Sequence, residues 1–124
     1  MSKSNSCIRV FADEHQIAAC RAELGRVQTP ISRLSKVLNL AGNEVRLKIV
    51  YLMHIEGEMC PCDLSDVLGM TVPAISQHLR KMKDGGLIID NKVGQTVFYS
   101  LIRENLDVLV PLFKQVRKEE PLVY

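Results

Sequence analysis

Two cysteines separated by one residue are the part of the chain best suited to chemistry. Cys60 and Cys62 flank a proline, are followed by an aspartate, and precede a short amphipathic segment. Cysteine thiolates are the preferred ligands of soft metal ions, which take three or four sulfurs. Cys7 and Cys20 are the other two cysteines of the chain. These four thiols are therefore the candidate metal ligands, although spacing alone does not show that they converge.

Three other interpretations of the Cys60 and Cys62 pair stay open. The thiols could be buried and structural, because a free cysteine behaves as a small hydrophobe. The surrounding Glu58 and Asp63 argue against a core position, and the dipole at the start of a helix favours thiolates. Oxidation of either thiol to a disulfide with Cys7 or Cys20 would instead give a redox signal. A thiol enzyme is disfavoured, because there is no CxxC within a βαβ pattern and no phosphate-binding glycine loop.

The segment after the thiols predicts two short helices joined by a tight turn. The first helix is expected over residues 62–68 and ends at Gly69, and the second is expected over residues 73–83. Thr71 is the predicted capping residue of the second helix, which ends at a pair of glycines. Two short helices with a glycine-containing turn are typical of a helix-turn-helix.

The polar face of the second short helix predicts DNA binding. Serine and glutamine side chains can bond to base edges, and arginine and lysine can contact bases or neutralise phosphates. A solvated charged face is the ordinary alternative, and His78 is as suited to packing as to a base or phosphate. The candidate DNA contacts are Thr71, Pro73, Ser76, Gln77, His78, Arg80, Lys81 and Lys83, together with Lys92 and Gln95 at the tip of the next element.

That next element is predicted to be a β-hairpin, or wing. Residues 87–90 and 95–101 are rich in β-branched and aromatic side chains, with residues 91–94 as the turn between them. On the N-terminal side, one helix is expected to stop near Gly25, and Thr29 with Pro30 is expected to open another. Asn43 is the predicted cap of a central helix. A last helix over residues 103–118 is expected to be kinked or interrupted at Pro111.

The predicted fold class is mainly α with a small β-hairpin (α+β). The order of elements is that of a winged helix-turn-helix with additional N- and C-terminal dimerisation helices. Residues 1–10 are expected to form a flexible arm, and residues 11–120 the DNA-binding and dimerisation domain. The predicted interface of a homodimer consists of Leu24, Leu106, Leu109, Val110 and Phe113.

The composition fits one globular domain: the chain has 124 residues, of which 47% are hydrophobic and 24% charged. A formal net charge of +2 is compatible with a polyanionic partner but does not demonstrate one. No signal peptide and no apolar run long enough for a bilayer is visible. We therefore expect a cytoplasmic protein with reduced thiols, no membrane partner and no enzymatic activity.

The stretch "GEMCPCDLSDVLGMTVPAISQHLRKMKDGGLI", with the wing segment from Gly94 to Tyr99, resembles the ArsR/SmtB family of metal-responsive bacterial repressors. The similarity covers about residues 34–101 and, more weakly, the N-terminal arm. Its most specific part is Glu-x-Cys-x-Cys-Asp-Leu, beginning at Glu58. The resemblance implies a homodimeric winged-helix repressor that releases operator DNA when a metal ion binds.

Within that family, the cadmium- and lead-sensing branch joins the cysteine pair to thiols of an N-terminal arm, commonly the arm of the other subunit. Cys7 falls where the first arm cysteine belongs, whereas Phe11 stands near the second, for which Cys20 is a substitute. A second family site on the C-terminal helix uses histidine and carboxylate ligands. Arg103 and Asn105 occupy its first two ligand positions here, so we predict no zinc site on that helix.

The resemblance and the all-thiolate ligand set together imply a soft effector ion: Cd²⁺, Pb²⁺, Hg²⁺ or Zn²⁺. The sequence does not choose among these metals, nor does it give the operator sequence. Whether Cys20 ligates metal, and whether the site bridges two subunits, also stay open at this stage.

Overall fold

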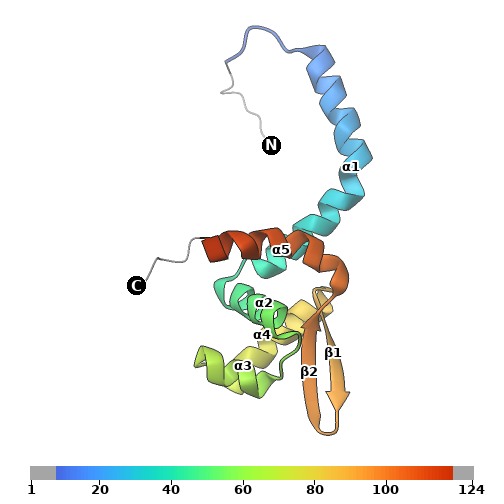
Figure 1. Ribbon diagram of the computed structural model, residues 1–124. Helices are drawn as coiled ribbons and strands as arrows, with labels where there is room; N and C mark the ends of the chain where they lie inside the picture. Colours follow the sequence, from blue (N-terminus) through green and yellow to red (C-terminus); the bar gives the residue numbers. More distant parts are fainter. Residues whose placement is uncertain (1–7, 119–124) are drawn as a thin grey trace. The chain divides into compact units, whose positions relative to one another are not determined.

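The computed structural model describes residues 8–118. Its elements are mostly helical with one antiparallel hairpin, which confirms the predicted fold class. By contacts the chain divides between Arg33 and Leu34 into two compact units, and each is described by itself. In chain order the elements (Figure 1) are α1 (Glu14–Ala41), α2 (Glu44–Glu56), α3 (Pro61–Leu68), α4 (Val72–Asp84), β1 (Ile88–Val93), β2 (Thr96–Leu101) and α5 (Arg103–Lys118).

The core of the second unit is built around α2, as its nearly continuous apolar character predicts. Helix α4 contacts α3 and β1, and α2 contacts β2 (Figure 1). Every helix of this unit buries at least one large apolar side chain, so none of these helices can shift without disturbing a shared core. The side chains with at most 1% of their surface exposed are Ile49, Val50, Met53, Leu64, Ile75, Leu79, Met82, Leu87, Ile88 and Leu109.

The helix-turn-helix forms as predicted because its turn and cap signals are local. Gly69 ends α3 with φ +68°, a left-handed conformation that favours glycine. The Ser65 hydroxyl donates a hydrogen bond to the carbonyl of Met70. Thr71 Oγ1 accepts a hydrogen bond from the backbone N–H of Ala74, 3.3 Å away, and so caps α4. These contacts fix the angle at which α4 leaves the turn.

The wing is a two-residue hairpin, and its turn lies later than the sequence predicts. Strands β1 and β2 pair antiparallel, with Val93 opposite Thr96, so Gly94 and Gln95 form the turn. Gly94 supplies the positive φ, +64°, that a tight hairpin turn requires. Lys92 is therefore in β1, opposite Val97, rather than at the tip. Gln95 does lie at the tip, as expected.

Both terminal helices are continuous where interruptions were expected. Helix α1 runs through Gly25 and Pro30, and α5 runs through Pro111. A proline inside a helix removes one backbone donor, and a glycine costs about 1 kcal/mol relative to alanine. Pro30 and Pro111 are both exposed, so water can satisfy the carbonyl that each one leaves without a donor. The predicted break between two N-terminal helices is therefore wrong.

One buried polar side chain connects α5 to the start of the wing. Asn105 is 7% exposed, and its Nδ2 donates hydrogen bonds to the carbonyls of Gly86 and Leu87, at 3.2 Å and 3.3 Å. The backbone N–H of Ile102 also donates to the Leu87 carbonyl, at 3.1 Å. Asn105 thus serves the fold at this position. Within residues 8–118, no helix is long and apolar enough to cross a bilayer.

Candidate DNA-binding surface and thiol pair

Helix α4 presents one polar face to solvent and buries the other. Ile75, Leu79 and Met82 point into the core, which leaves the charged residues on the outside. Ser76 and His78 are half-buried at the border between the two faces. The predicted contacts that are exposed on α4 and its cap are Thr71, Pro73, Gln77, Arg80, Lys81 and Lys83.

Lys83 connects the end of α4 to the wing. Its Nζ lies 2.7 Å from Asp90 Oδ2 on β1, and both side chains are exposed. The hydrogen bond and charge of Asp90 raise the pKa of Lys83, and the same bond lowers the pKa of Asp90. Asp90 therefore already balances part of the Lys83 charge. The sequence predicts a DNA contact at Lys83 and gives no sign of this internal partner.

His78 packs against Arg46, a residue that the sequence analysis did not single out. Arg46 Nη1 lies 3.5 Å from His78 Nδ1, and its Nε donates a 2.6 Å hydrogen bond to the carbonyl of Leu40. Arg46 thereby joins the end of α1, the start of α2 and the face of α4. Burial lowers the pKa of His78 below 6.5, and the charges of Arg46 and Lys81 lower it further.

This lowered pKa predicts a pH dependence of stability. Native His78 binds a proton less readily than unfolded His78, so the free energy of unfolding should fall as pH drops below 6.5. Urea unfolding at about pH 7.5 and about pH 5.5 measures this loss. His78→Gln should show a smaller loss than the wild type, whereas His15→Gln on α1 should match it. If His78→Gln lost as much free energy of unfolding as the wild type over this pH range, His78 would not be the source of the loss.

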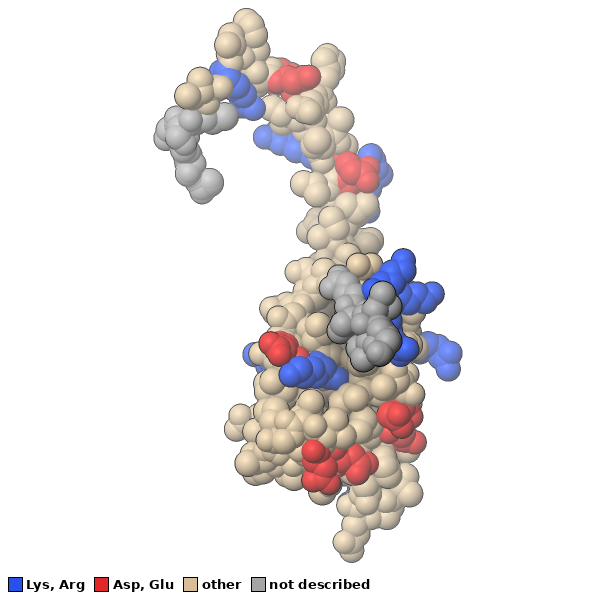
Figure 2. All heavy atoms as spheres, turned by 60° about the vertical axis from the view of Figure 1, so that its left-hand side comes forward, with Lys and Arg blue, Asp and Glu red and all other residues tan. Residues whose placement is uncertain are grey.

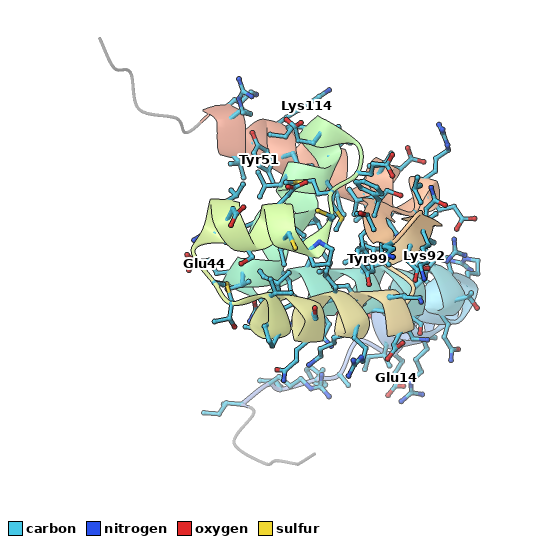
Figure 3. The ribbon with its side chains drawn as sticks, turned by 90° about the horizontal axis from the view of Figure 1, so that it is seen from below. Glu14, Glu44, Tyr51, Lys92, Tyr99 and Lys114 are labelled. Carbon is cyan, nitrogen blue, oxygen red and sulfur yellow. The ribbon has the colours of Figure 1, made fainter. Side chains whose placement is uncertain are left out.

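The wing carries the two remaining predicted DNA contacts. Lys92 of β1 and Gln95 of the turn are both exposed. Figure 3 shows Lys92 and Tyr99 on the hairpin, from its two strands. Elsewhere, acidic and basic side chains are interspersed on the face that Figure 2 displays, without a field of one sign. The predicted contacts on the wing are thus accessible to a partner.

The two closely spaced thiols lie at the N-terminal end of α3. Cys60 is the residue before the helix, in an extended conformation, and Pro61 is the first helical residue. The side chain of Cys60 is half-buried and makes no capping hydrogen bond to the first turn of α3, while Cys62 is exposed. Cys62 is therefore accessible to an exogenous ligand and Cys60 only in part, and the interpretation as two buried structural thiols does not fit Cys62.

The residue just before the thiols is bonded to the wing. The backbone N–H of Met59 donates to the Tyr99 carbonyl at 3.0 Å, and the N–H of Tyr99 donates to the Met59 carbonyl at 2.8 Å. Met59 itself is 8% exposed. Cys60 therefore directly follows a residue whose backbone is hydrogen-bonded to β2, and it directly precedes α3. The sequence holds no local signal for this pairing, because the two partners lie forty positions apart in the chain.

The other two predicted ligands belong to other parts of the chain than this pair. Cys20 is exposed on α1 in the first unit, and Cys7 lies outside the described residues. Within residues 8–118, no group of three or more histidine, cysteine, aspartate or glutamate side chains could hold a metal ion. A soft-metal site at Cys60 and Cys62 would therefore need at least one further ligand.

Two of the predicted interface residues belong to the core of their own chain. Leu109 is 0% and Phe113 2% exposed. The Phe113 ring makes an edge-to-face contact with Tyr51 at 5.4 Å and stacks on His54 at 5.0 Å. Figure 3 shows Tyr51 of α2 near Lys114 of α5, beside this cluster.

The other three residues of the predicted interface are accessible to a second copy to different extents. Leu24 is 60% exposed on α1, and Leu106 and Val110 are half-buried on α5. The exposed apolar residues of α5 are Leu112 and Val116, at 45% and 51%. The place of Leu109 and Phe113 in the core follows from the same helical spacing that suggested an interface, because that spacing does not say which surface it meets.

Comparison with known proteins finds the same arrangement. Residues 43–90 match the family described as bacterial regulatory protein, arsR family. The chain is 31% identical over 104 residues to the cadmium resistance transcriptional regulatory protein CadC homolog of Staphylococcus aureus, covering 84% of each chain. It resembles the structure of HlyU from Vibrio cholerae N16961 with a TM-score of 0.66 and 27% identity, covering 73% of this chain and 98% of HlyU.

A homodimeric winged helix-turn-helix DNA-binding domain from Mycobacterium bovis shares the fold, with a TM-score of 0.63 and 22% identity over 93% of this chain and 94% of that domain. The family match covers α2, α3, α4 and the start of the wing, the elements that build the surface described above. The identity to the Staphylococcus aureus regulator extends over most of both chains. The chain therefore belongs to the arsR family of bacterial regulatory proteins, which are DNA-binding transcriptional regulators and not enzymes.

Proposed function

We propose that the chain is a homodimeric repressor that releases operator DNA when a soft metal ion binds its cysteine thiolates. The observation that carries the proposal is the position of Cys60 and Cys62 at the start of the helix-turn-helix, directly after the Met59–Tyr99 bridge. The similarity to a cadmium resistance regulator supports a metal effector, and the homodimeric structural neighbour supports a dimer. The effector is drawn from Cd²⁺, Pb²⁺, Hg²⁺ and Zn²⁺.

Operator binding is assigned to α4 and the wing. Helix α4 has 13 residues and is about 20 Å long, which suits the major groove. Ser76 and Gln77 would bond to base edges, and Arg80 and Lys81 would contact bases or phosphates. In a dimer, two such helices would enter successive major grooves about 34 Å apart, on a palindromic operator.

The donor set fits a soft ion only in part. Cys60 and Cys62 supply two sulfurs, and a stable soft-metal site takes three or four. We assign Cys7 as the next ligand, and Cys20 is the alternative thiol on α1. A bound ion would supply strong bonds between these thiolates and so restrain the start of α3. Because α3 is joined to α4 by a three-residue turn, a displacement of α3 would also displace the DNA-contacting face of α4.

The coupling between metal and DNA follows from the same contacts. Movement of Cys60 acts on Met59, whose two backbone bonds hold Tyr99 of the wing. The thiol pair can therefore disturb both DNA-contacting elements at once. If metal weakens operator binding, operator DNA must weaken metal binding by the same factor.

A pair of lysine variants tests the DNA-binding surface. The DNA is a duplex selected from a random pool by its binding to the wild-type protein. Lys81→Ala, on the exposed face of α4, should weaken binding to this duplex by about tenfold. It should also reduce by about one the slope of log affinity against log salt concentration. Lys114→Ala on α5 removes the same charge and should change affinity by less than about twofold. Fluorescence anisotropy at several salt concentrations measures both. Equal losses for the two variants would contradict the assignment to α4.

A further inference from the structure

Arg46 belongs to α2, yet its side chain is bonded to the end of α1 and lies against α4. Its Nε donates a 2.6 Å hydrogen bond to the carbonyl of Leu40. Leu40 is in the last turn of α1, where backbone carbonyls have no partner within their own helix. Nη1 of the same guanidinium lies 3.5 Å from Nδ1 of His78 on α4. The short bond to Leu40 therefore holds the guanidinium with one nitrogen directed at the histidine ring.

The end of α1 that binds Arg46 is itself packed against the end of α4. Leu40 is 8% exposed, and its side chain occupies the space beside Gly85, the residue that follows α4. A Cβ at Gly85 would collide with it. The carbonyl that binds Arg46 is thus fixed relative to α4, and so is the guanidinium that faces His78.

The contact with Arg46 determines where the neutral ring of His78 carries its proton. A guanidinium has only N–H donors, so a ring nitrogen that faces it can only accept. Nδ1 must then be without a proton, which places the proton on Nε2. Burial and the charges of Arg46 and Lys81 lower the pKa of His78, so the ring is mostly neutral near pH 7. His78 therefore offers a single donor, its Nε2–H group.

The position of His78 on α4 indicates what this N–H group meets in a complex with DNA. His78 is half-buried at the border between the buried and the polar face, whereas its neighbour Gln77 is exposed. When the polar face of such a helix points to the base edges, its borders lie near the phosphates beside the groove. The Nε2–H tautomer can donate to a phosphate oxygen, whereas the opposite tautomer would present a lone pair to it.

We propose that Arg46 is a positioning residue for operator binding, which holds His78 as the Nε2–H tautomer so that the ring donates to a backbone phosphate. Two of the three guanidinium nitrogens of Arg46 are directed at partners within the chain, so Arg46 acts through His78 and not by a contact of its own. This inference deepens the proposed function and rests on its assignment of operator binding to α4.

The tautomer is measured on the full-length wild type, by ¹⁵N NMR of the histidine rings at about pH 7.5. Nε2 of His78 should give the shift of a nitrogen that carries a proton, and Nδ1 that of one that does not. His78→Gln identifies the signals. In Arg46→Ala the pKa of His78 should rise, because a neighbouring positive charge is removed, and the Nδ1–H tautomer should become populated. A wild-type ring with its proton on Nδ1 would overturn the proposal without any variant.

A double-mutant cycle separates positioning from a direct contact, with fluorescence anisotropy on the selected duplex as the measurement. Arg46→Ala and His78→Ala should each weaken binding by about tenfold. The double variant should bind within about twofold of His78→Ala, because Arg46 has nothing left to position. The slope of log affinity against log salt concentration should be the same in all four proteins. Losses that add to about a hundredfold, with a slope reduced by about one in Arg46→Ala, would show that Arg46 itself contacts a phosphate and would overturn the proposal.

A duplex of scrambled sequence tests the choice of a phosphate as the acceptor. His78→Ala should weaken binding to the scrambled and the selected duplex by the same factor, since phosphates are common to both. A loss confined to the selected duplex would place His78 on a base edge and overturn this assignment.

Lys48→Ala is the matched control for Arg46→Ala. It also removes one positive charge from α2, at an exposed position where Lys48 Nζ lies 3.2 Å from Glu44 Oε2. Its affinity should differ from the wild type by less than about twofold, and a tenfold loss would contradict a specific role of Arg46. If the wild type selected no duplex, the proposed function itself would fail. A wild type that binds DNA, with Arg46→Ala as tight, would refute only this inference.

Discussion

A chain with both Cys60→Ser and Cys62→Ser is expected to bind operator DNA within about twofold of wild-type affinity and to keep it bound when Cd²⁺ is added. The wild type should lose at least about tenfold in affinity under the same conditions. The reason is positional: the pair lies at the start of α3, and Cys62 is exposed, so neither thiol supplies the polar contacts of α4. Anaerobic fluorescence anisotropy with and without Cd²⁺ measures both affinities.

Cys20→Ser is the matched control for this double variant, because it removes one exposed thiol from α1. It should retain most of the response to Cd²⁺. If the double variant lost operator binding in the absence of metal, the thiols would be structural. The proposed division between a reading surface and a sensing pair would then be wrong.

Phe113→Ala is expected to lower the free energy of unfolding by about 3–5 kcal/mol, the largest change in stability that we predict. Phe113 is 2% exposed and packs against the rings of Tyr51 and His54. Truncation would leave a cavity between α2 and α5 and remove two aromatic contacts. Urea unfolding at several protein concentrations measures the loss.

Leu112→Ala, one residue earlier on α5, is the comparison for Phe113→Ala. Leu112 is 45% exposed, so its truncation should cost less than about 1 kcal/mol. The Phe113→Ala cost should remain when the wild type and variant are compared as monomers at low concentration. A variant that kept its monomer stability and only dissociated more readily would return Phe113 to the interface between copies.

The elements with local signals could be predicted from the sequence. Thr71 caps α4 and Asn43 caps α2 because a side-chain oxygen reaches a backbone N–H three residues ahead. Gly69 supplies the left-handed turn residue, and alternating apolar residues mark the wing. These signals depend on neighbours within a few residues. The predicted bounds of the helix-turn-helix and the hairpin are therefore close to those of the structure.

The remaining features depend on distant partners or on a balance of small costs. The Met59–Tyr99 bridge and the Arg46–His78 contact join residues far apart in the sequence, with no marker at either end. Pro30 stops or continues a helix according to how its surroundings satisfy one carbonyl, which composition does not reveal. The ligands that complete the thiol site are likewise a matter of convergence, and spacing along the chain does not fix convergence.

The central claim is that the thiols bind a soft metal ion, and an anaerobic titration of the reduced protein with Cd²⁺ tests it most directly. The thiolate-to-metal ultraviolet band should saturate at about one ion per chain. Cys7→Ser, Cys60→Ser and Cys62→Ser should each lose band intensity, while Cys20→Ser keeps it. Absence of tight Cd²⁺ binding in the wild type would contradict the account. It would favour the alternative in which oxidation of the thiols, rather than a metal ion, is the signal.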